Sequence, residues 1–161
     1  CFFVKTSFGQ GIEFDEESGL YAQIDVLEFE NKTKDDLFDK TLEWFTLNYN
    51  SVNDAVQLKN KESGKIIIKG LMVFYEEMGK TINIEYTLIF EFKESRLRYT
   101  FTGFSGYCLS ATGNTFLPIP NFESTTKQKV LSHYLSKGEG WINNSIQSLI
   151  EYVKLDNSDD W

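Results

Sequence analysis

The sequence predicts a two-layer α+β fold, in which an antiparallel meander sheet of about five strands carries two main helices on one face. Residues 81–93 alternate between apolar and polar side chains, with Ile89 as the exception, which is typical of a strand with one buried and one wet face. Residues 34–49 and a C-terminal segment have apolar residues at helical spacing, so each helix needs an apolar surface to cover. The expected order of elements is β-α-β-β-β-β-α.

Length and charge limit the domain count and the classes of partner. The 161 residues match a single domain. We expect it at residues 20–155, between a flexible N-terminal tether at residues 1–19, which has no sustained period, and an acidic tail at residues 156–161. A net charge of −8 at pH 7 repels phosphate backbones and anionic lipid headgroups, so nucleic-acid binding is not expected.

The first helix has a clear beginning. Thr33 is followed three residues later by Asp36, a capping-box pattern that starts a helix over residues 34–49. Three carboxylates, Asp35, Asp39 and Glu43, lie on its polar face, where a solvated surface is a better explanation than a metal site. The strands are expected at residues 20–29, 55–59, 65–75, 81–93 and 97–101.

The C-terminal third is expected to be less regular. Residues 103–123 are rich in Gly, Pro, Ser, Thr and Asn, which predicts a long irregular connection. Ser124 can cap a short helix that runs through Leu135, and residues 137–140 end it before a last helix. The apolar stripe of that last helix consists of Ile142, Ile146, Leu149, Ile150 and Val153.

The two cysteines lead to separate expectations. Mature bacterial lipoproteins begin at a lipid-bearing cysteine, so lipid attachment at Cys1 is one interpretation; the other is that the chain was simply cut there. Cys108 is expected to be a buried free thiol, because two cysteines cannot form a disulfide framework. With His133 as the single histidine, no metal site is expected.

The sequence contains no recognisable catalytic motif. The segment Gly103-Phe104-Ser105-Gly106-Tyr107 departs from the G-x-S-x-G pattern of hydrolases at its last position. Nothing in the sequence brings His133 close to Ser105, and the acids form no pattern that selects a pair. We therefore expect a protein that is not an enzyme and has no cofactor.

Two segments of the chain resemble a known family. The segment from Thr33 to Gly70 has an acidic helix start, the aromatic pair Trp44-Phe45 and the turn Glu62-Ser63-Gly64-Lys65. Together with IEYTLIFEFKESRLRYTFTGF, it resembles a family of bacterial domains of unknown function with a TATA-binding-protein-like (TBP-like) fold, commonly found on envelope proteins that carry signal peptides. The resemblance covers roughly residues 20–105.

The resemblance implies a TBP-like fold and a bacterial envelope location, which together with Cys1 predicts a periplasmic or surface lipoprotein. It implies no activity, because the family has none assigned. The DNA-binding protein that names the fold has a basic sheet face, whereas the presumed open face of residues 81–93 carries Asn83, Glu85, Thr87 and Glu91. Nucleic acid is therefore not an expected partner, and membrane contact is expected only through a lipid anchor.

The leading function is a non-catalytic binding or protein-interaction module. If alternate residues of the strand at 65–75 face the core, an apolar patch of Ile67, Leu71, Val73 and Tyr75 faces outward, where a partner protein or a second copy could bind. The alternative is that the long connection or the short helix covers this patch.

The second function is a carrier of an apolar small molecule or lipid in a helix-grip-like cavity. The candidate lining residues are Tyr86, Phe90, Tyr99, Phe101 and Trp141. The same aromatic residues can be consumed in ordinary core packing.

Overall fold

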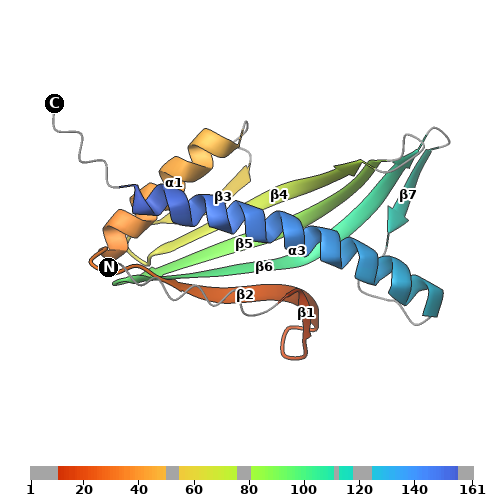
Figure 1. The fold of residues 1–161 in the computed structure, drawn as a ribbon, viewed down its shortest axis with the longest axis horizontal. Coiled ribbons are helices and arrows are strands. Elements are labelled where there is room, and N and C mark those ends of the chain that lie inside the picture. Colours follow the sequence, from red (N-terminus) through yellow and green to blue (C-terminus); the bar gives the residue numbers. More distant parts are fainter. Residues whose placement is uncertain (1–10, 50–54, 76–80, 111–112, 118–124, 156–161) are drawn as a thin grey trace.

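The structure is a computed structural model in which one antiparallel sheet is covered on one face by two helices (Figure 1). It describes residues 11–49, 55–75, 81–110, 113–117 and 125–155, of which 75, 107–110, 113–117 and 125–132 are described by their backbone alone. The elements are β1 (Glu13–Asp15), β2 (Leu20–Glu28), α1 (Lys34–Asn48), β3 (Val56–Asn60), β4 (Lys65–Tyr75), β5 (Thr81–Lys93), β6 (Arg96–Ser110), β7 (Gly113–Leu117) and α3 (Thr125–Lys154). The predicted two-layer α+β class is confirmed, with more strands than expected.

The strand order explains how the sheet is assembled. The order is β1-β2-β6-β5-β4-β3, and β7 pairs with β6 beyond this path. Strands β3 to β7 are linked as consecutive antiparallel hairpins, while α1 carries the chain from β2 across to β3 at the far edge. Strands β4 and β5 have the predicted bounds.

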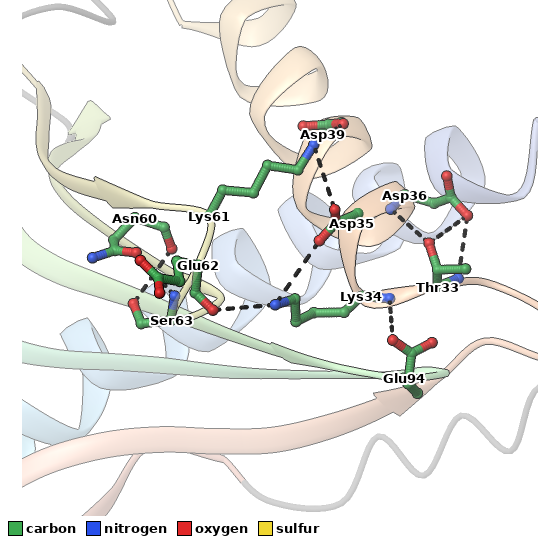
Figure 2. Close-up of polar contacts among 10 residues, drawn as sticks. All are labelled: Thr33, Lys34, Asp35, Asp36, Asp39, Asn60, Lys61, Glu62, Ser63 and Glu94. Atoms are coloured by element: carbon green, nitrogen blue, oxygen red, sulfur yellow. Dashed lines mark hydrogen bonds and ion pairs between the residues drawn. The ribbon is translucent and has the colours of Figure 1, made fainter.

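Helix α1 begins with the predicted capping box. The side chain of Thr33 accepts a hydrogen bond from Asp36 N, and Thr33 N donates to Asp36 Oδ2 over 3.2 Å (Figure 2). The helix start is also tied to the sheet, because Lys34 N donates to Glu94 Oε1 and Lys61 Nζ lies 2.6 Å from Asp39 Oδ2. These contacts attach α1 to the β3–β4 and β5–β6 turns.

The predicted tether at residues 1–19 is wrong for its C-terminal part. Strand β1 pairs with β2, and Ile12 is 8% exposed. Ile12 N also donates to Glu139 Oε1 of α3 over 2.8 Å, so tertiary contacts order a segment too short to display a period of its own. Residues 1–10 and the predicted tail at 156–161 lie outside the described residues.

The predicted irregular connection at residues 103–123 is also wrong where the structure describes it. Residues 96–110 form one long strand that is followed by β7. The register shifts between Glu85 and Thr87 of β5, opposite Gly103, which has a φ of 64°. Glycine in this conformation is typical of a β-bulge, so Gly103 bends a continuous strand rather than ending it. Residues 118–124 lie outside the described residues.

The predicted break at residues 137–140 is absent, because α3 runs without interruption from Thr125 to Lys154. Gly138 is buried, and a Cβ at this position would lie 3.3 Å from Ile12 Cδ1 and 3.9 Å from Met72 Sδ. Glycine here allows the helix to approach the sheet closely. The separate short helix from Ser124 is therefore the first part of α3 wherever it is described.

The core lies between the sheet and the helices. The predicted stripe of α3 is fully buried, with Ile142, Leu149, Ile150 and Val153 each 0% exposed. It packs on the inward side chains of β4, β5 and β6 and on the buried side of α1.

Candidate functional site

The face of the sheet opposite the helices carries a row of four apolar residues and one threonine that crosses the strands. Register places these residues side by side on β2, β6, β5, β4 and β3 in turn: Ile24, Thr100, Ile89, Ile67 and Leu58. We call them the apolar row. Four strand spacings of about 4.8 Å give the row a length of about 19 Å. Ile24 is 41% exposed and Leu58 40%, and the members between them are partly buried.

Strand β2 turns the apolar side chains of Ile24 and Val26 toward this open face, while Leu27 faces the core. Ile24 and Val26 are 41% and 44% exposed, whereas Gln23, which precedes Ile24, is 2% exposed. Gln23 Nε2 donates to Asn143 Oδ1 of α3 over 2.9 Å, which places this polar side chain in the helix layer. A strand with one buried face normally shows the opposite orientation. The outward apolar side chains of β2 therefore need an explanation other than core formation.

The predicted patch on β4 lies on the same face. Leu71 is 43% exposed and Val73 38%, and both point away from the helices as expected. Ile67 is partly buried and belongs to the apolar row, and the side chain of Tyr75 lies outside the described residues. The alternation of a single strand predicts this patch but not Ile24 and Leu58, which lie on other strands. One feature of the sequence indicates that the apolar surface extends beyond β4: Ile89 is the one apolar residue at an outward position of β5.

A cationic pocket lies beside the apolar row, toward the β5–β6 turn. Its volume is about 250 Å³, and Val26 forms part of its wall. Arg98 donates to Glu91 Oε2 from Nε over 2.8 Å and from Nη2 over 2.5 Å, and Lys65 Nζ lies 3.8 Å from Glu91 Oε1. The residues that line the pocket are Val26, Ser63, Gly64, Lys65, Glu91, Phe92, Lys93, Arg96 and Arg98.

The open face carries more positive charge than the polar and acidic pattern of β5 predicts. The outward residues of β5 include exposed Glu85, as expected, although Asn83 is only 5% exposed. The neighbouring strands add cations that the pattern of β5 alone does not reveal. By register and exposure, the whole face carries Lys65, Lys69, Lys93, Arg96 and Arg98 against Glu13, Asp15, Glu28, Glu85 and Glu91. The face is therefore balanced in charge as a whole, and four of its five cations gather at the pocket.

The predicted cavity-lining residues are packed against one another instead. Tyr86 and Phe101 are 2% and 0% exposed with ring centroids 5.3 Å apart, and Tyr99 lies 6.0 Å from Phe101. Phe90 is 0% exposed, and Trp141 covers Tyr86 at 5.4 Å. Burial raises the pKa of Tyr99 to about 12. These residues fill the core between the sheet and α3.

A shallow pocket of about 310 Å³ between α1 and α3 includes Trp141 but none of the other four cavity candidates. Trp44 and Tyr49 contribute aromatic walls, and Trp44 Nε1 donates to Ser148 Oγ over 3.1 Å. This pocket is a surface depression between the helices and not a cavity inside the sheet layer.

The residues considered for catalysis are not arranged as a catalytic site. Ser105 Oγ donates to Glu85 Oε2 over 3.3 Å on the open face, and His133 is an exposed residue of α3. Within the described ranges, no cluster of three or more His, Cys, Asp or Glu residues could hold a metal ion. Asp35 and Asp39 instead face Lys61. Cys1 lies outside the described residues, and Cys108 is described by its backbone within β6.

Neither described helix combines the length and hydropathy of a membrane-spanning segment.

Comparisons with known proteins agree with this fold. A family model described as a domain of unknown function (DUF4468) with TBP-like fold matches residues 24–106, just over half of the chain. The chain belongs to this family. The predicted resemblance is thereby confirmed, and the matched segment contains the whole apolar row and all residues of the cationic pocket.

Two solved structures are similar to the chain. A TBP-like protein from Parabacteroides distasonis has a TM-score of 0.68 at 13% identity, covering 88% of this chain and 97% of its own. A DUF4468 family protein from Bacteroides ovatus has a TM-score of 0.67 at 9% identity, covering 91% and 92%. No curated protein matches the chain significantly. At these identities the likeness establishes the TBP-like fold and no activity.

Proposed function

We propose that this chain is a non-catalytic binding module that docks a partner protein on the open face of its sheet. The observation that carries the proposal is the orientation of β2, whose Ile24 and Val26 face solvent while Gln23 is buried under α3. Apolar side chains gathered on one face of a sheet mark an interface more often than chance exposure does.

Charge favours a different protein over a second copy as the partner. Each copy has a net charge of −8, so two copies repel each other, and the cationic pocket at one end of the open face complements an acidic surface. The length of about 19 Å across the apolar row is sufficient for about six residues of an extended chain or about 13 residues of a helix.

The test uses a photo-crosslinking amino acid placed at Ile24, in cells that make the full-length protein. A matched control carries the same group at Leu47, which is 68% exposed on α1 in the helix layer. We expect a discrete adduct from position 24 that is absent from position 47 and is lost when Val26→Glu is added. The Val26→Glu change lies on the surface, so the unfolding free energy should change by less than about 1 kcal/mol.

Three outcomes would overturn the proposal. They are no adduct from position 24, the same adduct from both positions, or an adduct with the mass of a second copy of this chain. The last result would assign the open face to a homodimer.

We also propose that the module works in the bacterial cell envelope. The resemblance to domains on signal-bearing envelope proteins supports this location, and the similar solved structures come from bacteria. When cells that make the full-length protein are fractionated, we expect the protein in the envelope fraction. A protein that remains in the cytoplasm would contradict the proposal.

A further inference from the structure

We infer that the cationic pocket binds the carboxylates of an acidic segment of the docked partner. This inference rests on the proposed function, because it assigns a chemical class to the partner at one end of the same face. It requires that the pocket attract anions, that its size suit a side-chain group, and that it be continuous with the apolar row.

The charge of the pocket is opposite to that of the protein. The sequence has a net charge of −8, yet its two arginines, Arg96 and Arg98, both line this pocket. Lys65 and Lys93 join them, and Glu91 is the one carboxylate in the wall. A concave site of one sign concentrates ligands of the other sign.

The ion pairs in the wall leave part of this positive charge uncompensated. Glu91 binds Arg98 through Oε2 and approaches Lys65 through Oε1, which fixes the positions of both cations. Glu28 is opposite Arg96 in register, yet neither Arg96 nor Lys93 forms an ion pair within the part of the chain that the structure describes. They are therefore available to an incoming oxyanion, and a guanidinium suits a carboxylate especially well because it can donate two parallel hydrogen bonds.

The size of the pocket favours a side chain over a whole small molecule. At about 250 Å³ it is smaller than the roughly 300–1,000 Å³ of pockets that enclose a drug-sized ligand. It can accept one or two carboxylates that belong to something larger. Arg96 and Arg98 are two residues apart on one face of β6, a separation of about 7 Å that suits two acidic side chains on neighbouring positions of one peptide face.

The pocket is continuous with the apolar row. Val26 lines the pocket, and Ile24 of the row is two residues away on the same face of β2. Arg98 pairs with Val26, and Thr100 of the row pairs with Ile24. Val26, Arg98, Glu91 and Lys65 are themselves in register across β2, β6, β5 and β4. This second row is parallel to the apolar row and about 7 Å from it, which suits a peptide that presents acidic residues on one side and apolar residues on the other.

The binding test uses two labelled probes, acetyl-Glu-Glu-Glu-Glu-amide and acetyl-Glu-Leu-Glu-Leu-Glu-Leu-amide, with the Lys version of the second as a control. Fluorescence anisotropy should show that the acidic peptides bind at least ten-fold more tightly than the basic one, and that this binding weakens as salt rises. The variant Lys93→Gln/Arg96→Gln should raise the Kd of both acidic peptides at least ten-fold. A matched variant, Lys59→Gln/Lys154→Gln, removes the same charge outside the pocket and should change the Kd less than two-fold.

Several results would overturn the inference. These are equal losses in the pocket and control variants, equal binding of the acidic and basic peptides, saturable binding of inorganic phosphate without binding of the peptides, or tighter binding of a 12-base-pair DNA duplex than of either peptide. The last two would reassign the pocket to a small phosphate anion or to a nucleic acid.

The inference and the proposed function can fail separately. If Lys93→Gln/Arg96→Gln leaves the adduct from position 24 unchanged while Val26→Glu removes it, the docking face stands and the carboxylate site is refuted. If tetraglutamate binding requires Arg96 but position 24 yields no adduct, the anion site stands and docking across the face is refuted.

Discussion

Replacing Gly140 by Ala should stabilise the protein, because α3 is continuous through this residue. Glycine in a helix interior costs about 0.8–1.0 kcal/mol relative to alanine. A Cβ at position 140 meets no atom within 4 Å, so nothing offsets this gain. For a protein of this size, 1 kcal/mol corresponds to a rise in Tm of about 2–4 °C. Urea unfolding followed by circular dichroism would measure the change directly.

Gly138→Ala is the matched control, two residues away in the same helix. Its new methyl would lie 3.3 Å from Ile12 Cδ1, so side-chain crowding should offset most of the helix-propensity gain and leave the stability within about 0.5 kcal/mol of wild type. The reasoning is refuted if Gly140→Ala destabilises the protein, since that would mean that the chain breaks at residues 137–140. It is also refuted if Gly138→Ala stabilises more than Gly140→Ala.

Three further predictions concern the fold. Thr33→Ala should lower the free energy of unfolding in urea by roughly 1 kcal/mol at pH 7. Because the hydrogen bonds from Thr33 lower the folded-state pKa of Asp36, this loss should shrink as pH falls through that pKa, and a loss that does not depend on pH would contradict the prediction. Gly70→Ala should destabilise by about 1–3 kcal/mol, because the new Cβ would collide with the Tyr86 ring, and an unchanged Tm would contradict this packing. Burial raises the folded-state pKa of Tyr86 and Tyr99, the latter to about 12, so stability should be lost as pH rises above 10, with their phenolate absorbance appearing only on unfolding.

The elements that could be predicted from sequence are those decided by nearby residues. The capping box at Thr33 and Asp36 sets the start of α1 through hydrogen bonds within one turn. The alternation of residues 81–93 identifies β5, because a strand with one buried face needs that period. The amphipathic stripe that ends at Val153 likewise predicts a buried helix face.

Two glycines that suggest breaks in the sequence lie inside continuous elements in the structure. Gly103 and Gly138 both suggested breaks, because glycine is the residue that most often ends helices and strands. In the structure Gly103 sits in a bulge within β6, and Gly138 lets α3 approach Ile12. Whether a glycine ends an element or allows close packing depends on what lies against it, and that neighbour is distant in the sequence.

The candidate site depended most strongly on tertiary structure. The sequence by itself determined that β2 alternates, since its period is a local property. It did not determine which set of side chains faces the helices, because both sets are compatible with a strand. Only the pairing of β2 with β6 and the contact of Gln23 with α3 turned Ile24 toward solvent, beside Thr100 and the arginines of β6. A surface assembled from separate strands exists only after the register is set, because register is what brings residues far apart in the chain to within about 5 Å of one another.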